Sequence, residues 1–241
     1  MTAHYRTLAR RLSPDVIPVF PLDGAVLLPG CDLPLNIFEP RYLNMIEDAL
    51  RADRLIGMVQ NAVSDDRAAP SESAMEPLTP IGGLGRIKQF SETEGGRYLV
   101  VLRGLKRFSI LGDANITSPY RQARVSYDGF DGDIESHRRP DLPKALTESS
   151  AERAKLVAAM KGYARTLGVA LDWEALKSVP IDDLVDQGAM ISPFRPFDKQ
   201  SLLEADDGRA RRRLLIGLMT LYSQNDEGKT QDDDTPRKDL Q

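Results

Sequence analysis

The sequence has very few of the residues from which disulfides and metal sites are built. Its 241 residues include one cysteine and two histidines. The single cysteine, Cys31, excludes an intrachain disulfide, and His4 and His137 lie too far apart in the sequence to predict a Cys/His zinc site. We therefore expect a chain without a metal ion, whose core is held together by packing rather than by cross-links.

The sequence also lacks a long apolar stretch. No run approaches the roughly 20 apolar residues that a membrane-spanning helix needs. Residues 1–16 carry Arg6, Arg10 and Arg11, but they contain neither the apolar segment nor the small-residue cleavage site of a secretion signal. We expect them to be the flexible N-terminus of a cytoplasmic protein.

A strong excess of one charge is missing as well. The chain has 32 Lys and Arg against 36 Asp and Glu, a net charge of −4. Domains that bind nucleic acid are usually basic, so this balance argues against a phosphate backbone as the main ligand. Residues 224–241, however, hold six acidic and three basic side chains, which leaves 30 acidic and 29 basic ones in residues 1–223. Because the acidity lies mostly in this tail, the argument against RNA is weak.

The first half of the chain is rich in short apolar segments separated by proline and glycine, which is typical of strands and tight turns. One helix interrupts them. It begins near Pro40 and has Leu43, Ile46 and Leu50 on one face. Gly104 is expected to break a strand. The expected strands span residues 17–20, 26–28, 33–38, 55–59, 84–90, 97–103, 107–111 and 121–127.

The second half shows helical periodicity. In the last helix, Leu214, Leu218 and Leu221 are expected on the apolar face. Asp198 is expected to cap the N-terminus of the preceding helix, over residues 198–205. Four helices of this length predict a small packed bundle. They are expected over residues 149–167, 180–190, 198–205 and 210–222.

These patterns predict an α+β protein in which a β-rich barrel is followed by a C-terminal helical bundle. Residues 62–80 are polar and are expected to form a long loop. The expected domain boundaries are a flexible N-terminus (1–16), a barrel with one helix (17–130), a linker (131–147), a helical bundle (148–223) and a disordered acidic tail (224–241).

The usual sequence signatures of catalysis are absent. Gly228-Lys229-Thr230 resembles the end of a phosphate-binding loop, but Ser223 stands where that loop needs a glycine. No helix is predicted after Gly82-Gly83-Leu84-Gly85, so these glycines fit a hairpin better than a dinucleotide site. The chain has no G-x-S-x-G nucleophile elbow. We therefore expect no catalytic residue, no cofactor and no enzymatic activity.

Basic side chains gather in two places. Arg209 and the arginines at 211–213 lie on a helix whose opposite face is leucine, so we expect them to form a solvated face. Arg103, Lys106 and Arg107 lie at a strand end, where a binding role is open.

Seven short blocks of the sequence carry a family resemblance. They are IPVFPL (17–22), LPG (28–30), LPLNIFEPRY (33–42), IGGLGRI (81–87), RYLVVL (97–102), GLKRF (104–108) and KQSLLE (199–204). In this order and spacing they resemble the Lon protease N-terminal substrate-binding domain family. The resemblance covers residues 17–222.

The resemblance implies a PUA-like pseudo-barrel followed by a helical bundle, in agreement with the patterns above. In full-length Lon proteases this domain precedes an ATPase module and a peptidase with a Ser–Lys dyad. Neither module is recognisable here, so the chain resembles the stand-alone bacterial members. The related cereblon-type domains carry a zinc site and an aromatic cage, which one cysteine and the single tryptophan, Trp173, do not fit.

The resemblance further implies a non-catalytic module that binds unfolded or extended polypeptides. Such a module would serve as an adaptor or chaperone-like factor in protein quality control, with a protease or chaperone as partner. Arg41, Tyr42, Phe90, Arg107 and Phe108 are the candidate binding surface. The alternative is an RNA-binding PUA-like module that uses the basic residues at 103–107. No residues in the sequence support a third interpretation, that of a hydrolase.

Overall fold

The computed structural model describes residues 7–9, 11–62, 76–115, 117–133 and 150–227. The chain divides into two units. The first is formed by Met1–Arg139 with Ala189–Ala205, and the second by Pro140–Gly188 with Asp206–Gln241. Residues 189–205, which we expected in the helical bundle, thus group with the strands. The expected loop, the linker and the acidic tail lie largely outside the described residues.

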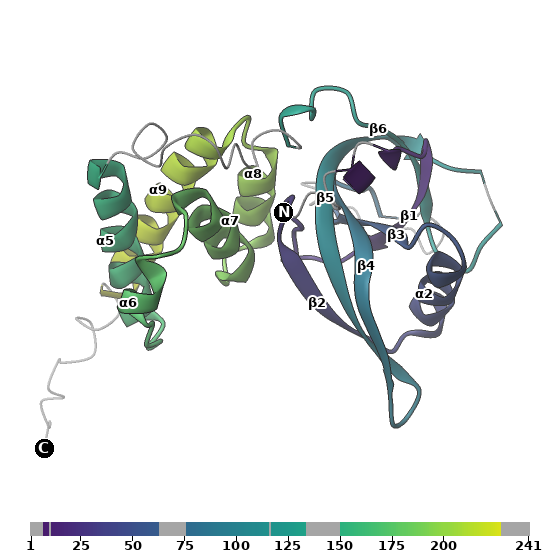
Figure 1. The fold of residues 1–241 in the computed structure, drawn as a ribbon, viewed down its shortest axis with the longest axis horizontal. Coiled ribbons are helices and arrows are strands. Elements are labelled where there is room, and N and C mark those ends of the chain that lie inside the picture. Colours follow the sequence, from purple (N-terminus) through teal and green to yellow (C-terminus); the bar gives the residue numbers. More distant parts are fainter. Residues whose placement is uncertain (1–6, 10, 63–75, 116, 134–149, 228–241) are drawn as a thin grey trace, which may run out of the picture. The chain divides into compact units, whose positions relative to one another are not determined.

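The first unit contains a mixed sheet that closes on itself (Figure 1). The strand order is β2-β5-β4-β3-β1-β6, and β6 also pairs with β5, so all strands except β2 form a closed barrel. β1 and β3 are parallel, and the other pairs are antiparallel. The predicted α+β class and β-rich barrel are confirmed. The strands are β1 (Val16–Pro21), β2 (Asp32–Ile37), β3 (Leu55–Val59), β4 (Ile81–Thr93), β5 (Arg97–Asp113) and β6 (Gln122–Ser126).

A buried segment without regular structure packs against the barrel strands. Residues 26–29 are buried but form no strand, so the strand predicted over 26–28 was wrong. A Cβ at Gly83 would lie 2.0 Å from the Leu27 carbonyl oxygen, and a Cβ at Gly104 would lie 2.1 Å from that of Leu28. These two positions require glycine because no side-chain atom fits between backbones at such distances. The segment is apolar because it fills the core, and not because it joins the sheet.

β5 runs through Gly104 without a break, in contrast to the expected interruption. Gly85 pairs with Gly104 and Leu84 pairs with Lys106, which leaves Leu105 as an extra residue in β5. Such a bulge bends a strand and increases its twist. The glycine therefore marks a bend in one long strand rather than the end of a short one.

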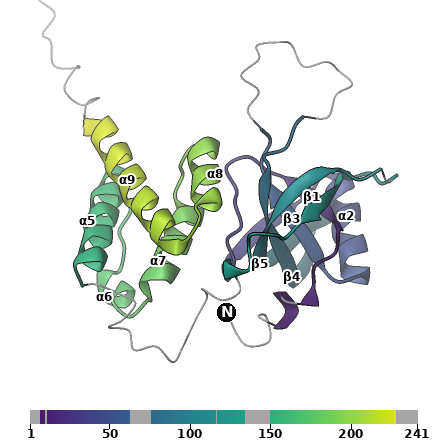
Figure 2. The ribbon, with the colours of Figure 1, turned by 90° about the horizontal axis from the view of Figure 1, so that it is seen from above.

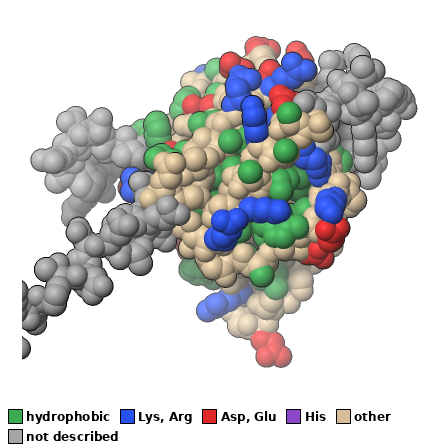
Figure 3. All heavy atoms as spheres, turned by 90° about the vertical axis from the view of Figure 1, so that its left-hand side faces the viewer, with side chains coloured by type: hydrophobic (Ala, Val, Ile, Leu, Met, Phe, Trp, Pro, Cys, Tyr) green, Lys and Arg blue, Asp and Glu red, His purple; other side chains and the backbone are tan. Residues whose placement is uncertain are grey.

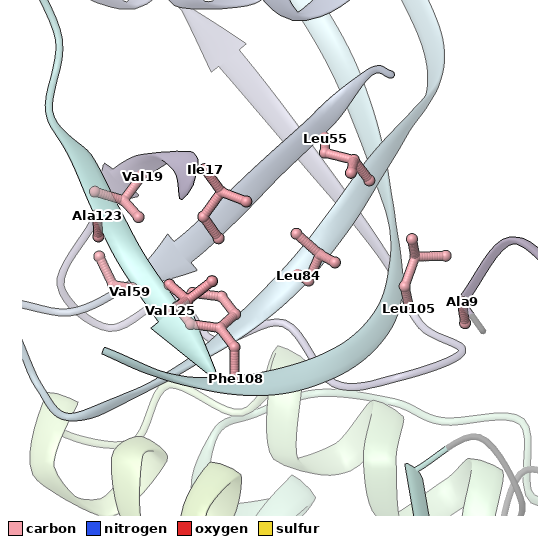
Figure 4. Packing of buried hydrophobic residues seen from close by; sticks show 10 residues of the cluster. All are labelled: Ala9, Ile17, Val19, Leu55, Val59, Leu84, Leu105, Phe108, Ala123 and Val125. Carbon is pink, nitrogen blue, oxygen red and sulfur yellow. The ribbon is translucent and has the colours of Figure 1, made fainter. Parts of the chain in front are cut away.

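Phe108 belongs to the apolar core of the barrel (Figure 4). Its ring lies 2.4 Å from the position that a Cβ at Gly82 would take, and 2.8 Å from that of a Cβ at Gly57. Glycines of β3 and β4 thus make room for the ring. The cluster comprises Ala9, Ile17, Val19, Leu55, Val59, Leu84, Leu105, Phe108, Ala123 and Val125.

The helix α2 (Pro40–Arg51) packs against β1 (Figure 2). It begins at the proline, as predicted. Its buried residues are Tyr42, Met45, Ile46 and Ala49, which follow the spacing of one helix face. The predicted face was wrong in two of its three residues, since Leu43 and Leu50 are only half-buried.

The helix α8 (Pro196–Glu204) is fixed to the barrel by buried amides. The Gln60 side chain donates hydrogen bonds of 3.0 Å to the Pro196 carbonyl and to the Gln200 side chain. Gln200 in turn donates to the Ile81 carbonyl of β4 at 2.9 Å. Because buried polar groups are costly unless they are hydrogen-bonded, these contacts specify where the helix sits.

The C-terminal end of α8 is capped by Arg107 of β5. Its Nη1 donates to the carbonyls of Leu203 and Ala205 at 2.9 and 2.7 Å. These carbonyls lie at the C-terminal end of the helix, where C=O groups have no hydrogen-bond partner within the helix. The guanidinium also forms a buried ion pair of 2.8 Å with Asp133 and lies 4.9 Å from the Phe130 ring centre. One side chain thus connects β5, α8 and the segment after β6.

The second unit contains α5 (Ser150–Thr166), α6 (Trp173–Leu176), most of α7 (Ile181–Ile191) and α9 (Gly208–Glu227). α5 packs along α9, and the rings of Tyr163 and Tyr222 meet edge to face at 6.2 Å. Gly188 of α7 allows close approach to α9, since a Cβ there would lie 3.2 Å from Leu215. None of the helices that the structure describes has the length and apolar character to cross a membrane.

Two arginines of α9 are buried, which contradicts the predicted solvated face. Arg211 pairs with Asp186 at 2.8 Å, and Arg212 pairs with Glu152 at 3.0 Å. The apolar face of α9 is shifted as well, because its buried apolar residues are Leu215, Leu218 and Met219. Asp198 does not cap α8, since Arg195 holds that position and Asp198 lies in the first turn.

The close approach at Gly83 leads to the first prediction. Gly83→Ala should lower the free energy of unfolding by about 1–3 kcal/mol, because the new methyl group meets backbone that cannot move aside cheaply. Urea unfolding followed by circular dichroism measures the change. Gly217→Ala in α9 is the control: a Cβ there meets nothing within 4 Å, so stability should stay equal or rise by up to about 1 kcal/mol. Equal stability of the Gly83 variant and the wild type would contradict the argument.

The second prediction concerns the buried pair of Arg107 and Asp133. Arg107→Met should cost about 3–5 kcal/mol in urea unfolding, because it leaves the carboxylate buried without its partner. Adding Asp133→Asn should recover part of this loss, since the amide carries no charge. Arg41→Met, which removes a pair on the surface with Glu39, should cost less than about 1 kcal/mol. Similar losses for the two single variants would contradict the role assigned to Arg107.

Candidate functional site

Three of the five residues predicted to form a binding surface are buried. Phe108 has 0% and Arg107 5% of its surface exposed, and Tyr42 is also buried. Phe108 fills the barrel core, Arg107 caps α8, and Tyr42 packs its ring on Phe20, with 4.3 Å between ring centres. The prediction is corrected for these three, because the partners that bury them come from distant parts of the sequence.

The other two predicted residues are exposed. Arg41 forms an exposed ion pair of 2.8 Å with Glu39, and its guanidinium lies 4.5 Å from the Tyr42 ring centre. Phe90 of β4 meets the ring of Tyr98 edge to face at 4.9 Å. None of these interactions joins Arg41 to Phe90, so the two residues do not form one site by themselves.

The basic residues at 103–107 form no cationic surface. Arg103 pairs with Asp32 at 3.0 Å, and Lys106 and Arg107 are buried. These side chains therefore do not face solvent together, as a surface for phosphates requires. On the face drawn in Figure 3, Lys and Arg side chains occur in separate groups between hydrophobic ones.

An exposed apolar surface lies on the outward face of β2 and β5. Leu99 and Val101 of β5 pair with Asn36 and Pro34 of β2, so these four side chains point to the same face. Leu99 is 48% exposed and Phe38, just after β2, is 61% exposed. The Arg97 guanidinium lies 5.9 Å from the Phe38 ring centre. We call Pro34, Phe38, Leu99 and Val101 the outer patch.

The outer patch borders a strand edge. Within the part of the chain that the structure describes, β2 pairs only with β5. Gly104 donates to the Cys31 carbonyl at 2.9 Å, so by alternation Leu33, Leu35 and Ile37 point their backbone groups at β5, and the residues between them point away. Pro34 lies among the latter, where its missing N–H costs no ladder hydrogen bond. The edge therefore offers carbonyl acceptors and two N–H donors, with a proline between them.

Charged side chains close one end of the outer patch. Asp32 binds Lys88 at 2.8 Å and Arg103 at 3.0 Å. Burial alone would raise the pKa of Asp32, but the hydrogen bonds from the two cations outweigh it and hold this pKa below its ordinary value. The carboxylate stays ionised, and its charge is neutralised locally. The surface next to it is apolar apart from Asn36 and the Arg97 guanidinium beside Phe38.

Sequence reasoning missed Phe38 and Leu99 for two different reasons. Phe38 follows the alternation of β2, in which Leu35 and Ile37 are buried, and this signal places it on the exposed face. Leu99 lies inside the unbroken apolar run of residues 98–102, where alternation is not visible. Only the pairing of β5 with β2 shows that Leu99 points outward.

The chemistry that this site offers is apolar burial and backbone hydrogen bonding. Among the described residues, no group of three or more His, Cys, Asp and Glu side chains is placed to hold a metal ion. Extended polypeptides use both kinds of contact when they add to a sheet edge, with side chains giving specificity. The geometry therefore suits an extended ligand with apolar side chains.

Comparison with known proteins gives a consistent result. Residues 16–220 match the family described as the ATP-dependent protease La (LON) substrate-binding domain. Lon protease 2 of Sorangium cellulosum is 28% identical over 208 residues, which are 85% of this chain and 24% of that protein. The Lon protease of Anaeromyxobacter dehalogenans is 31% identical over 112 residues, 46% of this chain and 13% of that protein. The chain spans about a quarter or less of the curated relatives it matches.

Solved structures share the fold. The Lon N-terminal domain protein from Xanthomonas campestris has a TM-score of 0.55 at 22% identity, over 84% of this chain and 97% of that one. The N-terminal domain of Mycobacterium avium complex Lon protease has a TM-score of 0.56 at 19% identity, over 85% and 98%. With the family match running from β1 into α9, the chain belongs to the ATP-dependent protease La (LON) substrate-binding domain family.

Proposed function

We propose that the chain is a non-catalytic module that recognises unfolded or extended polypeptides, and that the outer patch is its binding surface. The observation that carries this proposal is the exposure of Phe38 and Leu99 on one face beside the edge of β2. Membership of a family described as substrate-binding supports the same class of ligand.

The binding energy in this proposal comes from two weak sources. Apolar client side chains bury surface against the outer patch, at about 25 cal/mol per Å² removed from water. A client segment that lies along β2 forms backbone hydrogen bonds with the groups of Asp32, Pro34 and Asn36 that point away from β5. Because Pro34 has no N–H, the edge cannot support a full ladder. Binding is therefore loose and tolerant of sequence, which suits the recognition of many unfolded clients.

In this role the chain binds clients without changing them. We propose that it acts in the cytoplasm as an adaptor or chaperone-like factor that holds clients for a protease or chaperone. The ATPase and peptidase activities of Lon proteases belong to its relatives, and the proposal assigns neither to these residues. RNA binding is the second candidate, but Arg103, Lys106 and Arg107 already have partners inside the fold, so it has less support.

The third prediction tests the outer patch. Leu99→Gln should weaken binding of a fluorescently labelled, permanently unfolded polypeptide about tenfold, because a buried leucine contributes about 1.5–3 kcal/mol. Fluorescence anisotropy measures the dissociation constant. The matched control is Leu221→Gln on α9, where the leucine is 50% exposed and lies outside the patch. This control should bind as the wild type does.

Two results would count against the proposal. Equal affinities of the Leu99 and Leu221 variants would remove the outer patch from binding. Salt-sensitive binding of single-stranded or structured RNA, without any binding of the unfolded polypeptide, would favour the RNA-binding module instead. Titrations at several salt concentrations with both ligands separate these cases.

A further inference from the structure

The first unit contains a cavity of about 650 Å³ that is separate from the outer patch. Its size falls in the range of pockets that bind small molecules, about 300–1,000 Å³. It is formed by the segment before β1, the second half of β5, β6 and the turn that follows β6. Its lining includes Ser13, Lys106, Arg124, Tyr127, Phe130 and Asp131.

Lys106 is the buried cation of this cavity. The residue is only 5% exposed. Its Nζ donates to the Ser13 hydroxyl and lies 4.1 Å from the Tyr127 ring centre. Among the described residues it forms no ion pair with a carboxylate. Burial lowers the pKa of Lys106, and the nearby charge of Asp131 acts in the opposite direction. A buried charge without an ion-pair partner is costly, and an anionic ligand group would compensate it.

The other charges of the cavity lie in exposed residues. Arg124 of β6 adds a second cation, and Asp15, Asp128 and Asp131 add three carboxylates. The Asp128 carboxylate accepts a hydrogen bond of 2.9 Å from the Ser126 hydroxyl. The cavity thus offers positive and negative groups together, with a net charge of −1 from these five side chains. A simple anion would meet the three carboxylates, and a simple cation would leave the buried charge of Lys106 without a counter-charge.

We infer that this cavity binds a small zwitterion, an α-amino acid or a short peptide with both termini free. The ligand carboxylate pairs with Lys106 and Arg124, and its ammonium group pairs with the aspartates. The apolar part of the ligand packs against Leu111, Val125 and Phe130. This assignment gives both kinds of charge a counter-charge, which neither a carboxylic acid nor an amine alone achieves. It does not depend on the outer patch, because the two sites share no residue.

The fourth prediction follows from the two charged ends of the ligand. In isothermal titration calorimetry, the tripeptide Gly-Leu-Leu should bind the full chain. Its C-terminal amide should bind at least about tenfold more weakly, because the neutral amide loses the charge-assisted hydrogen bonds to Lys106 and Arg124. N-terminal acetylation should also weaken binding. Free leucine is titrated in parallel. Tighter binding of leucine than of the tripeptide identifies an amino acid as the ligand, and tighter binding of the tripeptide identifies a peptide.

Amino-acid substitutions test whether the tripeptide binds in this cavity. Lys106→Met should remove most of the difference between the tripeptide and its amide, and its urea unfolding should show equal or greater stability, because a buried charge is lost. Arg124→Gln changes an exposed residue and should reduce the same difference without affecting the fold. Lys155→Met, on the exposed side of α5, is the matched control. Equal binding of the free and the doubly blocked tripeptide, or no binding of either zwitterion, would overturn the inference.

Discussion

The backbone of residues 27 and 28 lies so close to Gly83 and Gly104 that a single added methyl group would overlap a carbonyl oxygen. This contact sets the geometry of the barrel. It brings an irregular segment into van der Waals contact with β4 and β5, and it places the bulge of β5 at the point where the strand turns from its pairing with β2 to its pairing with β6. The strand that carries Leu99 outward and Lys106 inward depends on this bend.

Buried charges are the second organising feature. Arg107 joins three segments of the first unit, and Arg211 and Arg212 join helices of the second. Arginine suits these positions because its planar guanidinium satisfies several acceptors at once. The consequence for function is that basic residues which look in the sequence like a phosphate-binding cluster are used inside the fold. The surface that remains for a partner beside β2 is apolar, in keeping with a family described as substrate-binding.

Part of the architecture follows from local patterns. Pro40 marks the first turn of α2, and residues 55–59 form β3 as predicted, because both signals act within a few residues. Gly104 and the apolar residues 26–28 were misjudged for one shared reason. A glycine that admits a neighbouring backbone and an apolar segment that fills a core have the same local pattern as a strand break and a strand. The binding residues show the same limit, since the Lys106-Arg107-Phe108 sequence gives no sign of Asp133 or of α8.

The sequence by itself determined the class of fold, the order of strands before helices and the family, because periodicity, turn residues and ordered motifs are all properties of neighbouring residues. Tertiary structure alone decided which side chains are available for binding. Exposure of Phe38 and Leu99 depends on the pairing of β2 with β5, and burial of Phe108 depends on glycines in β3 and β4. The cavity around Lys106 likewise combines residues from four separate segments. Its charges become neighbours only when the barrel closes.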